Sequence, residues 1–231
     1  MNATDPNLPL LESVVKTLGP LCEQLVFVGG CAAGLLITEA AAPPVRVTKD
    51  VDAIVEIVSL TEYHALERQL ESGGFRHDRS PDAPICRWTV GNALLDVMPT
   101  DESVLGFGNR WYAEAAHTAI QVILPSGRKI RLISPPAFIG TKLEAFHGRG
   151  AGDFLASHDL EDIITVVDGR PELSKEVREA SFQLREYLVA QIRALLQNHN
   201  FLEALPAHLP GDAASQARLP ELLSRLRALT R

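Results

Sequence analysis

Residues 25–58, LVFVGGCAAGLLITEAAAPPVRVTKDVDAIVEIV, constrain the fold more than any other part of the chain. Their pattern predicts a strand, a Gly-Gly turn, a helix, a loop and a second strand. Asp50 and Asp52 stand two residues apart in the second strand, so both carboxylates share one face, whereas Val51 and Ala53 face the other side. Two carboxylates side by side repel each other unless they share a proton, lie near Arg or Lys, or bind a divalent cation. We favour the cation.

Gly29 and Gly30 end the first apolar run and precede the helix-compatible stretch CAAGLLITEA. Glycines at this point let a ligand approach the free backbone amides of the first helical turn, where the helix dipole favours an anion. The pair is therefore a candidate phosphate site. A tight turn with close packing is the more common role of a Gly-Gly pair and stays as the alternative.

A second acidic strand is expected in a hairpin. Residues 85–90 and 93–99 read as strands joined by Gly91-Asn92, a dipeptide that readily takes positive backbone angles. The second of them, ALLDVMP, carries Asp96 within an apolar run. If this strand lies beside the strand of Asp50, Asp96 completes a carboxylate triad. The alternative is a surface-facing residue of a half-buried strand.

Two cations and two acids follow on a pair of expected helices. Ser134-Pro135 is a typical helix start, and Lys142 and Arg149 lie two turns apart near one face of the helix that follows. Both could reach a triphosphate, or lie on a solvated face. The next helix, capped by Ser157, carries Asp159 and Asp162 on one side, either as counter-ions of the two cations or as acids that suit the helix dipole.

The carboxy-terminal sequence predicts amphipathic helices over residues 175–197 and 218–229. In the last of these, Arg218 and Arg225 lie seven residues apart. They could clamp a polynucleotide acceptor or an antitoxin, although packing of this helix against its own domain is the simpler interpretation.

Composition limits the class of protein. The formal net charge of −7 argues against broad non-specific binding to nucleic acid. The amino terminus lacks the basic region and apolar core of a secretory signal, and no apolar run is long enough to span a bilayer. The three cysteines, Cys22, Cys31 and Cys86, have no metal-type spacing. We expect a soluble cytoplasmic protein with reduced thiols and no membrane partner.

The stretches FVGG at residues 27–30 and TKDVDAIVE at residues 48–56 resemble the signature of the polymerase-beta-like nucleotidyltransferase superfamily. TKLEAFHGRG and SHDLEDIITVVDGR, at residues 141–150 and 157–170, make the chain most similar to the AbiEii-type nucleotidyltransferases, many of them toxins of toxin-antitoxin pairs. The resemblance covers most of residues 20–170. One departure is the spacing from Gly30 to Asp50, which is longer than is usual in the family.

The resemblance implies an α/β (α+β) nucleotidyltransferase fold with a small mixed sheet, a core over residues 1–134 and a helical part over 135–231. The implied reaction moves a nucleoside monophosphate from a nucleoside triphosphate, for instance ATP, to an acceptor hydroxyl on RNA, the end of a transfer RNA, a protein or a small molecule. An antitoxin is an implied partner. The alternatives are a non-catalytic nucleotide- or protein-binding module on the same fold and a purely structural interaction protein.

The implied site residues fall into two groups. Asp50, Asp52 and Asp96 would bind two Mg²⁺ ions, and Asp96 could also accept the proton of the attacking hydroxyl. The implied catalytic set adds Lys142, because a lysine in this Lys-x-x-Ala helix faces the active site in the family. The nucleotide would be bound by Gly29, Gly30, Thr48, Lys142 and Arg149.

Overall fold

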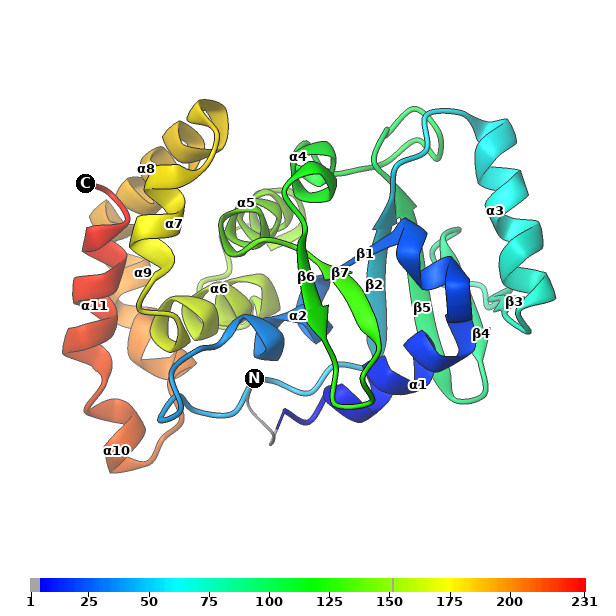
Figure 1. Cartoon of the computed structure of the whole chain (residues 1–231). Helices are drawn as coiled ribbons and strands as arrows, with labels where there is room; N and C mark the ends of the chain where they lie inside the picture. Colours follow the sequence, from blue (N-terminus) through cyan, green and yellow to red (C-terminus); the bar gives the residue numbers. More distant parts are fainter. Residues whose placement is uncertain (1–4, 151) are drawn as a thin grey trace. The chain divides into compact units, whose positions relative to one another are not determined.

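The computed structural model describes residues 5–150 and 152–231 (Figure 1). By its internal contacts the chain divides into two compact units. The sheet unit comprises Pro6–Ala32 and Val47–Ser134, and the helical unit comprises Ala33–Arg46 and Pro135–Arg231, together with Asp5. The expected domain division at residues 134 and 135 stays a prediction, and the segment Ala33–Arg46 groups with the helical unit. Among the described residues, no helix has both the length and the apolar character to cross a bilayer.

The sheet unit contains a seven-stranded mixed sheet in the order β3-β4-β5-β2-β1-β7-β6. The pairs β1–β7 and β2–β5 are parallel and the other neighbours are antiparallel. This confirms the expected α/β class. The strands are β1 (Leu25–Val28), β2 (Asp50–Val55), β3 (Arg76–His77), β4 (Arg87–Val90), β5 (Ala93–Pro99), β6 (Ile120–Ile123) and β7 (Lys129–Leu132).

Helices of the sheet unit cover the strands that carry the aspartates. In Figure 1 the first helix, drawn in blue, crosses the sheet, and it packs on β2 and β5. Tyr63 is buried, and its hydroxyl donates to the carbonyl oxygen of Val97 on β5 at 2.9 Å. The helical elements of this unit are α1 (Leu8–Leu18), a 3₁₀ turn η1 (Gly19–Gln24), α3 (Leu60–Ser72) and α4 (Tyr112–His117). Helix α2 (Gly29–Leu36) begins in the sheet unit, and its residues from Ala33 on group with the helical unit.

Local signals explain most of these boundaries. Gly91 takes φ 56° in the turn between β4 and β5, as expected for the Gly-Asn hairpin. Ser59 caps α3 by accepting a hydrogen bond from the amide of Glu62. α1 ends at Leu18 with Gly19 as its C-cap, and Gly19-Pro20 then opens η1, because proline is tolerated in the first turn of a helical segment.

The helical unit is built from α5 (Pro135–Ala145), a π-helical turn η2 (Phe146–Gly150), α6 (His158–Gly169), α7 (Leu173–Glu179), α8 (Phe182–Gln197), α9 (His199–Ala204), a 3₁₀ turn η3 (Leu205–His208), α10 (Ala213–Gln216) and α11 (Leu219–Ala228). The prediction of a single helix over residues 175–197 is wrong. The segment is divided into α7 and α8, because Ala180 adopts an extended backbone and Ser181 caps α8 by accepting from the amide of Leu184.

Gly169, at the end of α6, lies against the segment that follows α2. It is the last residue of α6, and a Cβ at this position would lie 2.9 Å from Cγ1 of Ile37. Its carbonyl oxygen accepts hydrogen bonds from the amides of Thr38 and Glu39, both at 3.0 Å. The absence of a side chain therefore allows the segment after α2 to approach the end of α6.

Candidate functional site

The three aspartates of the expected triad lie on two neighbouring strands of the sheet unit. β2 and β5 run parallel, and Asp52 stands opposite Asp96 in their register. Asp50 precedes Asp52 by two residues on β2, so all three side chains project from the same face of the sheet. Along the start of β2, half-buried aspartates alternate with buried residues. The expected placement of the three aspartates is confirmed, while their roles stay predictions.

Gly29 lies against the carboxylate of Asp52. Its φ is 66°, and a Cβ built on it would stand 1.9 Å from Oδ2 of Asp52. Because Val28 pairs with Asp52 across β1 and β2, and α2 begins at Gly29, Asp52 is held at the first turn of that helix. The glycine is therefore needed for the approach of the aspartate. Contact of Gly29 and Gly30 with phosphate stays a prediction.

Arg87 on β4 links two of the aspartates. Its Nε donates to Oδ1 of Asp96 at 2.8 Å and its Nη2 donates to Oδ2 of Asp96 at 2.7 Å. The same Nη2 also donates to Oδ2 of Asp50 at 3.0 Å. The hydrogen bonds to Asp96 raise the pKa of Arg87 above its already high ordinary value, so the guanidinium stays charged. Arg87 thus offsets the repulsion between the carboxylates of Asp50 and Asp96. A nearby arginine was one of the three alternatives that the sequence left open.

Arg87 was not predicted as a site residue from the sequence, although a signal was present. A two-residue turn at Gly91-Asn92 fixes the hairpin register, in which Arg87 pairs with Asp96. Counting outward from the expected turn would have placed the two side chains on one face. The contact between Arg87 and Asp50 depends on the long-range pairing of β2 with β5 and has no comparable local signal.

Thr48 contacts Asp50 at the start of β2. Its hydroxyl donates to Oδ1 of Asp50 at 2.8 Å, and its amide donates to the side-chain oxygen of the buried Asn7 at the same distance. Thr48 and Arg87 therefore orient opposite oxygens of the Asp50 carboxylate. The expected binding of nucleotide by Thr48 stays a prediction.

The residue types of this site fit a hard divalent cation such as Mg²⁺, which prefers carboxylate oxygens. Within residues 5–150 and 152–231, however, no three His, Cys, Asp or Glu side chains are arranged to hold a metal ion. Asp50 and Asp96 both direct an oxygen to Nη2 of Arg87. A cation that bridged these two oxygens would take the place of that nitrogen.

A second charged cluster lies in the helical unit. The ammonium of Lys142 on α5 is 3.2 Å from Oδ1 of Asp159 and 2.6 Å from Oδ2 of Asp162, both on α6. The three side chains are 9%, 5% and 4% exposed. The expected role of the two aspartates as counter-ions is confirmed for Lys142. The alternative interpretation, in which the acids interact favourably with the helix dipole, also holds for Asp159, because it lies in the first turn of α6.

Two arginines complete this cluster. Arg149 donates from Nε and Nη2 to the two oxygens of Asp159, at 2.9 Å and 2.8 Å, while 73% of its side chain is exposed. Burial acts to raise the pKa of Asp159, but Arg149 and Lys142 together hold that pKa below its ordinary value. Arg46 pairs with Asp162 at 3.2 Å. Arg46 was not predicted as part of this cluster, because nothing in the loop sequence indicates a contact with α6.

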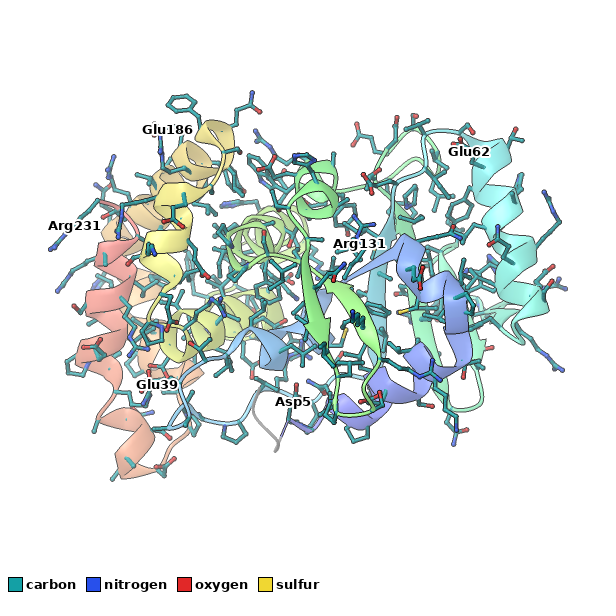
Figure 2. All side chains as sticks on the ribbon, viewed as in Figure 1. Asp5, Glu39, Glu62, Arg131, Glu186 and Arg231 are labelled. Atoms are coloured by element: carbon teal, nitrogen blue, oxygen red, sulfur yellow. The ribbon has the colours of Figure 1, made fainter. Side chains whose placement is uncertain are left out.

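Arg218 and Arg225, the expected clamp, are directed into their own unit. Nε of Arg218 lies 2.7 Å from Oδ2 of Asp168, and both arginines pair with Glu39, which Figure 2 labels. The backbone oxygen of Asp168 also accepts from Arg225. A clamp on an acceptor or antitoxin is therefore not supported, whereas packing of the last helix against its own domain is confirmed. The bonds to these two arginines also lower the pKa of Glu39.

Comparison with protein-family models gives no match, and comparison with curated proteins gives no significant match. Among solved structures, an antigenic nucleotidyltransferase-like protein from Paracoccidioides brasiliensis is 19% identical with a TM-score of 0.53, over 98% of this chain and 94% of that one. The antibiotic-resistance factor ANT(2'')-Ia is 19% identical with a TM-score of 0.49, over 87% and 99% of the two chains. The first similarity shows that this chain has the fold of a nucleotidyltransferase-like protein.

Proposed function

We propose that this protein is a metal-dependent nucleotidyltransferase that moves a nucleoside monophosphate from a nucleoside triphosphate to an acceptor hydroxyl. The observation that carries the proposal is the common face of Asp50, Asp52 and Asp96 on two adjacent parallel strands. The fit of Asp52 against Gly29, at the first turn of α2, supports it. The nucleotidyltransferase-like fold is consistent with it.

In this reaction the acceptor oxygen forms a bond to the α-phosphorus, and the bond from that phosphorus to the oxygen bridging to the β-phosphate breaks. The electron pair leaves with pyrophosphate, and the hydroxyl proton goes to Asp96. When bound at the three aspartates, two Mg²⁺ ions would lower the pKa of the hydroxyl and offset charge on the triphosphate. Thr48 would keep Asp50 oriented. The triphosphate would contact the amides of Gly29 and Gly30 and the side chain of Thr48.

The finer assignment is an AbiEii-type toxin that acts in the cytoplasm and is neutralised by an antitoxin. The acceptor would be RNA, including the end of a transfer RNA, a protein or a small hydroxylated molecule. The formal net charge of −7 makes RNA the least favoured of these classes, because affinity for RNA depends on neutralising phosphates.

A second candidate is a non-catalytic module that binds a nucleotide or a protein on the same fold. One observation favours it, since Arg87 already neutralises Asp50 and Asp96 through hydrogen bonds of 3.0 Å or less. A site closed by an internal ion pair needs no cation for its stability.

The test is transfer of label from each of the four α-labelled nucleoside triphosphates, with Mg²⁺ and with RNA, protein or small hydroxylated molecules as acceptors. Asp52→Asn is the site variant, and Asp82→Asn is the matched control, because Asp82 is an exposed acid of the same unit. We expect transfer by the wild type and by Asp82→Asn, and loss of transfer in Asp52→Asn. Transfer that survives in Asp52→Asn would refute the assignment of the carboxylates. Binding of nucleotide without transfer to any acceptor would favour the non-catalytic module.

A further inference from the structure

Arg87 occupies the position where a cation would bridge two of the proposed ligands. One nitrogen, Nη2, lies 3.0 Å from Oδ2 of Asp50 and 2.7 Å from Oδ2 of Asp96. The side chain of Arg87 is 21% exposed, and those of Asp50 and Asp96 are 30% and 9% exposed. The three groups are thus partly shielded from water, so their mutual attraction is stronger than that of a surface pair.

A Mg²⁺ ion held by Asp50 and Asp96 would draw carboxylate oxygens to about 2.1 Å. A divalent cation on both Oδ2 atoms and a guanidinium nitrogen at its present distance from both would repel each other at close range. A cation on these two oxygens would therefore compete with Nη2 for them. The bond from Nε to Oδ1 of Asp96, at 2.8 Å, uses the other oxygen and can persist while Nη2 moves.

We propose that Arg87 is an internal counter-ion that competes with divalent cations for Asp50 and Asp96. Without a cation, it holds the two carboxylates together. When a cation binds, Nη2 leaves Asp50, while Nε keeps Arg87 attached to Asp96. The inference rests on the proposed function, because it takes the aspartates as metal ligands, and it assigns Arg87 the role of a positioning residue.

The test is the affinity of the full chain for Mn²⁺, measured by titration calorimetry in the wild type, Arg87→Gln and Arg87→Lys. We expect Arg87→Gln to bind Mn²⁺ about tenfold more tightly, the change that corresponds to one lost charge-assisted hydrogen bond. Arg87→Lys, which keeps the charge without the planar fork, should lie between the two. The matched control is Arg76→Gln, which removes one charge from an exposed residue of β3 and should leave the affinity unchanged.

Thermal unfolding gives a second readout that is independent of activity. In EDTA, Arg87→Gln should unfold at a lower temperature than the wild type, because two carboxylates lose their counter-ion. Saturating Mn²⁺ should restore more stability to this variant than to the wild type. If Arg87→Gln does not fold, Arg87→Lys carries the comparison.

The outcomes separate this inference from the proposed function. Affinity for Mn²⁺ that is unchanged or weaker in both Arg87 variants would overturn the inference, and transfer of label by the wild type would leave the function standing. Tighter binding in the variants without transfer to any acceptor would support the inference and overturn the function. Absence of Mn²⁺ binding in the wild type and in both variants would overturn the inference together with the metal site.

Discussion

Gly29 and Asp52 fit together so closely that a methyl group at residue 29 would stand 1.9 Å from Oδ2 of the aspartate. The positive φ of 66° at Gly29 and the pairing of Val28 with Asp52 create this approach. The Gly-Gly pair in the sequence therefore has a defined structural role at the proposed site. The close-packing interpretation of the pair holds for Gly29, whether or not phosphate also binds there.

Gly29→Ala should disturb both the fold and the site. A residue with a side chain is strained at this φ by about 1–2 kcal/mol, and the contact with Asp52 adds to that cost. We expect a lower free energy of unfolding in urea and loss of nucleotide transfer. Gly19→Ala is the matched control, because Gly19 has φ 55° and its Cβ would have no neighbour within 4 Å. Equal destabilisation by the two changes would show that backbone strain alone, and not Asp52, accounts for the effect.

Thr48→Val should weaken transfer while leaving the fold intact. The substitution keeps the size of the side chain but removes the hydroxyl that donates to Asp50 at 2.8 Å. We expect about a tenfold fall in kcat/KM, the equivalent of one hydrogen bond to a charged group. Thr48→Ser retains the hydroxyl and should recover most of the activity. Activity that is kept in Thr48→Val and lost in Thr48→Ser would instead assign the role to the methyl group.

Lys142→Met should destabilise the helical unit strongly. The change leaves Asp159 and Asp162, which are 5% and 4% exposed, without the ammonium that contacts both. Loss of one partner from a buried ion pair costs about 3–5 kcal/mol, and the remaining arginines should place the effect near the lower value. Chemical denaturation would measure it. The control, Lys175→Met, removes a lysine that is 71% exposed and should cost less than about 0.5 kcal/mol.

Acid should remove part of the stability through Asp159. Its pKa is lower in the folded protein than in the unfolded chain, where it is about 3.9. The contribution is therefore fully present well above that value and is lost as the pH falls through the folded pKa. Between about pH 5 and pH 2, the unfolding free energy should fall less steeply in Asp159→Asn than in the wild type. Glu186→Gln, at an exposed acid labelled in Figure 2, should retain the wild-type slope.

Arg218→Met should destabilise the helical unit by about 3 kcal/mol, because it removes the ion-pair partner of the buried Asp168. Arg227→Met on α11 is the control, since Arg227 is exposed. The urea unfolding midpoints of Arg218→Met and Arg227→Met measure the difference in stability between the two variants. Equal midpoints would mean that the ion pair does not stabilise the unit and would reopen the interpretation of Arg218 as part of a binding surface.

The sequence determined the features that depend on neighbours along the chain. The alternation of side chains places Asp50 and Asp52 on one face, and the residues at 91 and 92 make the hairpin. Ser157 caps α6 by accepting from the amide of Leu160, as expected. These features follow from backbone geometry and local hydrogen bonds, which act over a few residues.

Only the tertiary structure decided which charged side chains from distant segments form ion pairs. The pairing of β2 with β5 brings Asp50 to Arg87, and the helical unit joins Arg46 to Asp162 across more than one hundred residues. Such contacts depend on how separate elements pack, and the loss of solvation on burial decides which charges must find a partner. The sequence therefore predicts the carboxylates and, through the hairpin register, the pairing of Arg87 with Asp96. The contacts of Arg87 with Asp50 and of Arg46 with Asp162 are set by the packing of distant segments.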